Sequence, residues 1–232
     1  MRVILFGATG MIGSGVLLEC LADPRIESVV SVVRQASGAV HPKLHELIHD
    51  DFLDLVPVCA DFADADACFF CLGISSAGMK EEDYRRVTYD FAMAAAKELL
   101  AESPNSTFCF VSGAGTDGSG RGRVMWARVK GQTEQALLAM PFKGAYMFRP
   151  GYIQPKKGVR SKTALYQMIY NVVGPLYPIM RLFMPSYLTT TVELAHAMIE
   201  AARAGDERHV LETPDINRLA RQYDANVPGA PV

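Results

Sequence analysis

Apolar residues follow two different patterns along the chain. Short apolar runs alternate with longer stretches in which apolar residues recur every three or four positions. The short runs have the length and composition of buried strands, whereas a spacing such as Ile12, Val16 and Cys20 places apolar side chains on one helical face. The pattern predicts strands at residues 3–6, 29–34, 47–50, 67–73, 107–112, 145–149 and 209–213.

Helices are predicted between most of these strands, at about residues 12–21, 87–99, 129–140 and 190–202, the last opened by the capping-box pair Thr190 and Glu193. The strands are apolar almost throughout, so both of their faces should be buried. This arrangement predicts an α/β fold, a doubly wound parallel sheet with helices on both faces. No internal repeat or low-complexity linker is visible. We therefore expect one domain over residues 1–232, with a small apolar lobe at about 152–188.

The composition is that of a protein with a substantial core and a balanced charge. Half of the residues are hydrophobic, and 23 Lys and Arg residues nearly balance 25 Asp and Glu residues. No basic surplus points to a nucleic-acid partner. Five cysteines scattered through apolar segments suit buried thiols in a reducing compartment, and we expect a cytoplasmic protein. The apolar start of the chain is too short for a signal peptide.

Two spacings that resemble metal or redox motifs have simpler interpretations. Cys68 and Cys71 form a CxxC, but they fall in a predicted buried strand, where neighbouring side chains alternate faces. His41, His45 and His49 would share one face of a helix, but Pro42 and the predicted strand at 47–50 break that alignment. We expect no metal site.

A glycine-rich turn joins the first predicted strand to the first helix. In G7-ATGMI-G13, the first glycine allows a tight turn, the second allows close approach of a pyrophosphate, and the third allows the helix to pack on the strand. The helix N-terminus then offers free N–H groups and a positive dipole end to phosphates. With a strand before it and a helix after it, this loop predicts a dinucleotide-binding, Rossmann-like fold.

Arg34 ends the second strand, where NAD-binding proteins usually carry an acidic residue for the ribose 2′-hydroxyl. A guanidinium suits a 2′-phosphate instead, and Gln35 or Ser37 could add hydrogen bonds. The sequence therefore favours NADP(H) over NAD(H). The alternative is an exposed arginine without a ligand.

These motifs resemble those of the short-chain dehydrogenase/reductase superfamily, with the extended-type loop G-x-x-G-x-x-G, and the resemblance covers most of the chain. Among its branches, the chain looks most like the Tat-interacting oxidoreductase-like proteins, in the motifs C71-LGISS, V111-SGAG, V129-KGQTE and F148-RPG. The nitrogen-metabolite-repressor-like sensors are more distant. The resemblance implies a serine and a lysine of the catalytic set at Ser112 and Lys130. It implies cofactor contacts at Gly7, Thr9, Gly10, Met11, Ile12, Gly13, Arg34, Asp51, Phe52, Leu72, Gly73, Lys130 and Pro150.

Trp126 departs from the family pattern. In the intact family a tyrosine stands four residues before the lysine and exchanges a proton with the substrate oxygen, while hydride moves to or from the nicotinamide. An indole N–H donates a hydrogen bond but is not a useful acid near neutral pH. Trp126 therefore cannot take the tyrosine's role, although Lys130 can still bind the nicotinamide ribose.

Three interpretations follow from this substitution. In the first, the protein is an oxidoreductase for an apolar carbonyl or alcohol that uses another acid, for which Tyr152 and Tyr84 are the candidates. In the second, it binds NADP(H) without redox chemistry, as a sensor or partner-binding protein. In the third, hydride passes to an acceptor that is protonated by water or Lys130. The substrate itself cannot be identified from the sequence.

An uncharged apolar stretch follows at residues 163–180. Its polar and proline residues argue against a membrane span. A lid over an apolar substrate or a homodimer contact is favoured, and peripheral membrane contact is the alternative. The polar loop at 116–123 is expected to be a mobile connection.

Overall fold

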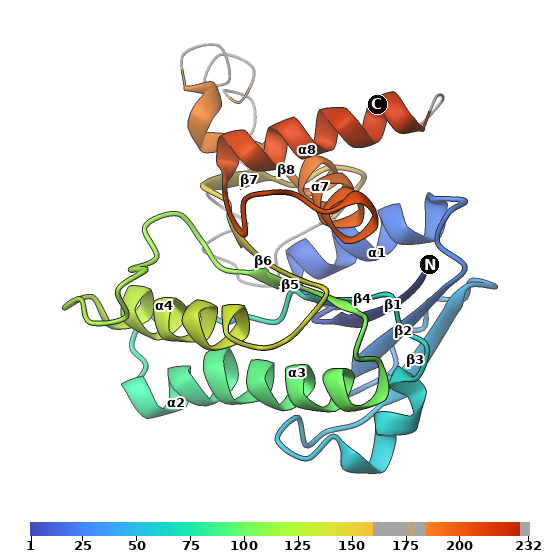
Figure 1. The fold of residues 1–232 in the computed structure, drawn as a ribbon, viewed down its shortest axis with the longest axis horizontal. Helices are drawn as coiled ribbons and strands as arrows, with labels where there is room; N and C mark the ends of the chain where they lie inside the picture. The colour runs from blue at the N-terminus through green and yellow to red at the C-terminus, as the bar shows by residue number, and fades with distance from the viewer. Residues whose placement is uncertain (160–176, 178–183, 228–232) are drawn as a thin grey trace.

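The computed structural model describes residues 1–159, 177 and 184–227. Its centre is a seven-stranded sheet in the order β3-β2-β1-β4-β5-β6-β9, and every neighbouring pair is parallel (Figure 1). The predicted doubly wound fold class is confirmed, and each predicted strand is present. The strands are β1 Arg2–Phe6, β2 Ser28–Val33, β3 Leu44–Ile48, β4 Ala67–Phe70, β5 Thr107–Val111, β6 Gly144–Arg149 and β9 Val210–Glu212.

Helices cover both faces of this sheet. On one face lie α1 Met11–Ala22, α7 Thr191–Ala204 and α8 Thr213–Asn226; on the other lie α2 Glu81–Arg85, α3 Phe91–Glu102 and α4 Met125–Leu138 (Figure 1). Short helices are also present at η1 Val56–Phe62 and η4 Pro185–Tyr187, and a π-helical turn, η2 Arg86–Asp90, joins α2 to α3.

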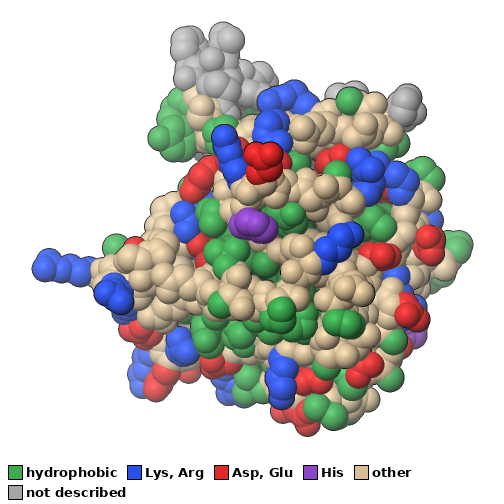
Figure 2. All heavy atoms as spheres, viewed as in Figure 1, with side chains coloured by type: hydrophobic (Ala, Val, Ile, Leu, Met, Phe, Trp, Pro, Cys, Tyr) green, Lys and Arg blue, Asp and Glu red, His purple; other side chains and the backbone are tan. Residues whose placement is uncertain are grey.

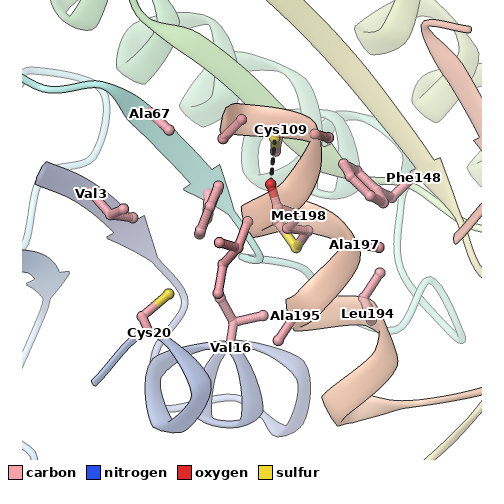
Figure 3. Packing of buried hydrophobic residues seen from close by; sticks show 14 of the residues in the cluster. Val3, Val16, Cys20, Ala67, Cys109, Phe148, Leu194, Ala195, Ala197 and Met198 are labelled. Carbon is pink, nitrogen blue, oxygen red and sulfur yellow. Dashed lines mark hydrogen bonds between the residues drawn. The ribbon is translucent and has the colours of Figure 1, made fainter. Parts of the chain in front are cut away.

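Strand side chains divide between two cores. Val3 and Leu5 pack under α1 and α7, whereas Ile4 and Phe6 face the α3 side. Figure 3 shows the first core, where Val16 of α1 lies on the side of α7 and Cys20 lies nearer to Val3 of β1. Because both faces of the sheet are buried, the strands are continuous apolar runs and do not alternate between apolar and polar residues.

A second, two-stranded parallel sheet joins the two ends of the segment that was predicted to be a lobe. It pairs β7 Tyr152–Gln154 with β8 Leu188–Thr190. Most of the apolar stretch at 163–180 lies outside the described residues. Within the part of the chain that is described, no helix is both long and apolar enough to cross a membrane.

Charges are dispersed on the face shown in Figure 2. Lysine, arginine and acidic side chains alternate around it, with apolar side chains between them. This distribution matches the balanced composition of the sequence.

The turn between β1 and α1 is held by backbone contacts that only glycine allows. Gly7 has a φ of +85°, and a Cβ there would lie 2.7 Å from the backbone of Cys71. A Cβ on Gly13 would lie 2.1 Å from the Gly7 carbonyl oxygen. The amide of Gly10 donates to that same carbonyl at 2.9 Å. Helix α1 therefore begins directly against the end of β1.

A buried cluster of charged groups fixes the other end of α1. The Glu19 carboxylate, 4 % exposed, accepts hydrogen bonds from His196 Nε2 of α7 at 3.2 Å and from Lys157 Nζ at 2.9 Å. His196 Nδ1 lies 2.9 Å from Asp224 of α8, and the ring stacks on Tyr223. The cluster joins α1, α7 and α8 to the segment that follows β7.

Replacement of Gly13 by alanine is expected to destabilise the protein by about 1–3 kcal/mol, because the new methyl group has no room beside the Gly7 carbonyl. Thermal unfolding followed by circular dichroism measures the effect. Gly73→Ala is the matched control: no atom lies within 4 Å of its added Cβ. Equal melting temperatures for the two variants would contradict the packing described above.

Replacement of Glu19 by glutamine should lower the free energy of unfolding at neutral pH by about 2 kcal/mol, because a charged acceptor is lost from two hydrogen bonds. Burial raises the pKa of Glu19, but the bonds from His196 and Lys157 outweigh it, so that the pKa lies below the usual 4.5. The contribution of Glu19 is therefore complete above about pH 4.5 and is lost as the pH falls through the lowered value.

Urea unfolding of the wild type and of Glu19→Gln across this pH range tests the prediction. The exposed Glu27 is the control, and Glu27→Gln should change stability by less than about 0.5 kcal/mol. A difference between wild type and Glu19→Gln that does not shrink at low pH would count against it.

Candidate functional site

A cavity of about 790 Å³ opens where β1, β2, β4 and β5 end. Parallel α/β sheets bind ligands at this edge, beyond the carboxyl ends of the strands. Most of the residues predicted to bind a cofactor line its wall. They are Gly7, Thr9, Gly10, Met11, Ile12, Arg34, Phe52, Leu72, Gly73 and Lys130, and Ser112, expected as a catalytic residue, lines the wall as well.

The start of α1 forms the centre of this wall. Gly10 is the N-cap and has no side chain to bond the first turn, and the Ser14 amide makes the hydrogen bond to its carbonyl at 2.8 Å. Backbone N–H groups of the first turn are therefore left for an anion, at the positive end of the helix dipole. Gly13 does not line the cavity; its part is the packing of α1 against β1.

The opposite part of the wall follows β2 and β3. The exposed Arg34 side chain lies there, and among the described residues it has no ion-pair partner. Gln35 and Ser37 do not line the cavity, and the Ser37 amide donates to Glu46 at 3.0 Å. Phe52 packs edge-on against Phe6 and Phe91, which fixes this part of the wall.

Asp51 was expected beside the adenine, but the acidic residue on the wall is Asp50. The Asp51 carboxylate accepts a hydrogen bond from the Leu53 amide at 3.0 Å. This local turn holds the Asp51 side chain against its own backbone, because Asp readily bonds the amide two residues on. The spacing in the sequence could not distinguish the two neighbours.

Ser112 and Lys130 meet at the third part of the wall. The Lys130 ammonium donates to the Ser112 carbonyl at 2.5 Å. The Ser112 hydroxyl lies 2.9 Å from the Thr116 hydroxyl, which donates to the Gly113 carbonyl at 2.8 Å. Burial lowers the pKa of Lys130 to about 8, against an opposing effect of Glu134. Lys130 can therefore exchange a proton near neutral pH.

Trp126 lies one helical turn before Lys130 on α4 but outside the cavity wall. Its ring lies 3.5 Å from where a Cβ on Gly115 would stand, so it covers the loop that follows β5. Four residues before Lys130, the structure thus has neither a hydroxyl nor a side chain on the wall.

The two tyrosines suggested as substitute acids do not line the cavity either. Tyr152 donates to Gln154 at 2.9 Å, and burial, with a smaller effect of Tyr177, raises its pKa. Tyr84 is 2 % exposed in the core. Pro150 is also absent from the wall, although its carbonyl accepts from the Ala114 amide in the loop after β5 at 2.9 Å.

The loop at 116–123 was expected to be mobile, but the structure holds it on α4. The Asp117 carboxylate accepts from Ser119 and from the Arg121 and Gly122 amides, and these hydrogen bonds lower the pKa of Asp117 to about 2. The Asp117 amide in turn donates to the Ala127 carbonyl of α4 at 3.1 Å. Its glycines and serines form a hydrogen-bonded turn.

Sequence reasoning missed several residues of the site. Val87, which lies within the π-helical turn Arg86–Asp90, and Phe91, which follows that turn, both line the cavity, although their spacing looked like that of a core helix. Thr116, the partner of Ser112, carried no signal in the sequence.

The CxxC residues point to opposite faces, as expected for a strand. Cys68 belongs to the α3-side core, and Cys71 packs against the α1-side core and reaches the cavity wall. Burial raises the pKa of both thiols. Among the described residues, no group of three His, Cys, Asp or Glu side chains could hold a metal ion.

No family model matches the chain. Its curated relatives include "Protein fmp52-2, mitochondrial" of Neosartorya fischeri, 26 % identical over 226 residues, which covers 94 % of this chain and 95 % of the relative. The protein of the same name from Aspergillus oryzae is 28 % identical over 222 residues, with 94 % and 96 % covered. These names contradict the cytoplasmic expectation. Reduced cysteines indicate a reducing environment, and they do not distinguish between compartments that provide one.

Similar solved structures are dehydrogenases and reductases. Glucuronic acid dehydrogenase from Chromohalobacter salexigens superimposes with a TM-score of 0.65 at 15 % identity, covering 90 % of this chain and 75 % of that one. WbmF of Bordetella bronchiseptica, in complex with NAD⁺, gives 0.64 at 14 %, covering 97 % and 77 %. A short chain dehydrogenase/reductase from Saccharomyces cerevisiae gives 0.66 at 12 %, covering 95 % and 98 %. The chain therefore has the Rossmann-like α/β fold of the short-chain dehydrogenases.

Proposed function

We propose that this protein binds NADP(H) in the cavity at the carboxyl edge of the sheet. The observation that carries the proposal is the continuity of one wall from Arg34, past the first turn of α1, to Ser112 and Lys130. This wall offers a cation, an anion-binding helix end and a polar pair in the order in which a dinucleotide presents its groups. The neighbour WbmF is named as a complex with NAD⁺.

Arg34 supports the phosphorylated form of the cofactor. Its guanidinium is exposed on the wall just after β2 and has no carboxylate partner within the described residues. A free guanidinium is suited to bidentate binding of a phosphate. The acidic residue on this wall, Asp50, follows β3. It therefore does not stand at the end of β2, where NAD-binding proteins carry the acidic residue that binds the ribose 2′-hydroxyl.

We further propose an oxidoreductase activity on an apolar carbonyl or alcohol, in which Lys130 exchanges the proton. The bound cofactor would supply or accept the hydride. Lys130 holds a proton at Nζ on the cavity wall, and its pKa of about 8 lets it give or take that proton near neutral pH. The resemblance of the Ser112 and Lys130 motifs to the Tat-interacting oxidoreductase-like branch supports the same assignment.

A second candidate function is a non-catalytic NADP(H)-sensing or partner-binding protein. The position of Trp126 favours it, because the acid of the family is replaced by a side chain that leaves the wall and covers a loop. The two functions share the cofactor and differ only in turnover.

Replacement of Arg34 by alanine should weaken NADPH binding by about tenfold or more, because a charge-assisted hydrogen bond to the 2′-phosphate is lost. NADH binding should not change. Calorimetric titration of the nucleotide-free protein with each cofactor measures both constants. Arg123→Ala, another exposed arginine, is the matched control. Equal losses for NADPH and NADH, or none, would sink the assignment of NADP(H).

Turnover separates the two candidate functions. With NADPH and a panel of apolar aldehydes and ketones, Trp126→Phe should retain most of the wild-type rate, and Lys130→Met should lose about a hundredfold or more. Loss of NADPH absorbance measures the rate. If NADPH binds and no member of the panel is reduced, the sensing function is favoured. If Trp126→Phe is inactive and Lys130→Met is active, the role given to Lys130 is wrong.

A further inference from the structure

The Lys130 amine has few polar contacts for a lysine inside a protein. Among the described residues, its Nζ makes one hydrogen bond, to the Ser112 carbonyl at 2.5 Å, although an ammonium carries three donors. Room beside it is left by Gly113, where a Cβ would lie 3.8 Å from Nζ. The amine lines the cavity wall and is anchored to the protein by this one contact among the described residues.

Its neighbours on α4 do not supply a counterion contact. Glu134 lies one turn further on, but its buried carboxylate accepts two hydrogen bonds from the Arg149 guanidinium, from Nε at 2.9 Å and from Nη2 at 2.5 Å. Trp126 stands one turn before and brings no oxygen atom. Burial without a bound carboxylate favours the neutral amine, which agrees with the lowered pKa of Lys130.

We propose that Lys130 is also a nucleophile, which forms a reversible imine with small uncharged aldehydes that enter the cavity when no dinucleotide fills it. The nitrogen lone pair forms a bond to the carbonyl carbon, and a proton from nitrogen passes to the oxygen. The resulting hydroxyl then leaves as water, with a second proton from nitrogen. One amine and one aldehyde give one imine and one water, and no oxidant or reductant is consumed.

The cavity suits this ligand class. Apolar side chains of Ile74, Val87, Phe91 and Val111 belong to the same wall as Lys130, so that an aryl or alkyl aldehyde can bury its apolar part. Ser112 lines the same wall, and its hydroxyl can donate to the carbonyl oxygen once it rotates away from Thr116. A desolvated lysine in such surroundings is the type that forms Schiff bases.

The inference is tested by trapping. Nucleotide-free wild-type protein is incubated with benzaldehyde and cyanoborohydride at about pH 8, and the labelled peptides are quantified by mass spectrometry. Lys97, whose side chain is 80 % exposed on α3, is the internal control. An ordinary lysine is neutral in only about 1 in 250 molecules at pH 8. We therefore expect Lys130 to be labelled at least about tenfold faster than Lys97, with a rate that rises through about pH 8.

Lys130→Arg, checked by circular dichroism to be folded, should remove this fast phase and leave Lys97 labelling unchanged. Equal labelling of Lys130 and Lys97 in the wild type, or a fast phase that persists in Lys130→Arg, would overturn the inference.

Only the expected protection by NADPH rests on the proposed function. If NADPH binds by calorimetry, saturating NADPH should suppress Lys130 labelling, and its failure to do so would overturn the inference. Selective labelling of Lys130 in a protein that binds no NADPH would support the inference and refute the proposed function.

Discussion

The contact between Gly13 and the Gly7 carbonyl is the constraint on which the cavity depends. It brings the first turn of α1 against the end of β1, while the positive φ of Gly7 turns the chain beside Cys71 at the end of β4. Any larger residue would move the helix outward. The N-terminus of α1, whose free amides suit an anion, is thus placed by backbone packing, before any ligand contributes energy.

A second set of contacts makes the Lys130 side of the cavity stiff. The loop that follows β5 is bonded to α4 through Asp117, and Arg149 ties α4 to the end of β6 through Glu134. With Glu134 taken by Arg149, the Lys130 amine is desolvated without a bound carboxylate. Burial is therefore the cause of the low proton affinity of Lys130, and Glu134, although paired with Arg149, opposes it.

Trp126 lies on α4, four residues before Lys130. A tyrosine there would stand one turn from Lys130, but Trp126 packs over Gly115 and leaves the wall. Lys130 contacts the Ser112 carbonyl, and the Ser112 hydroxyl contacts that of Thr116, a residue that the sequence did not single out. Among the described residues, the wall carries the Lys130 amine and the Ser112 hydroxyl, and no tyrosine lines it.

The sequence by itself determined the parallel sheet, the glycine turn, and the placement of Arg34, Ser112 and Lys130 at one edge. These follow from local rules: apolar periodicity, the conformations open to glycine, and the fact that parallel strands end together. Only the tertiary structure decided that Asp50 and not Asp51 lines the cavity, and that Trp126 and Tyr152 turn away from it. Past the end of a strand, the direction of a side chain depends on hydrogen bonds within the turn and on contacts with residues far along the chain. The spacing of residues in the sequence does not predict these contacts.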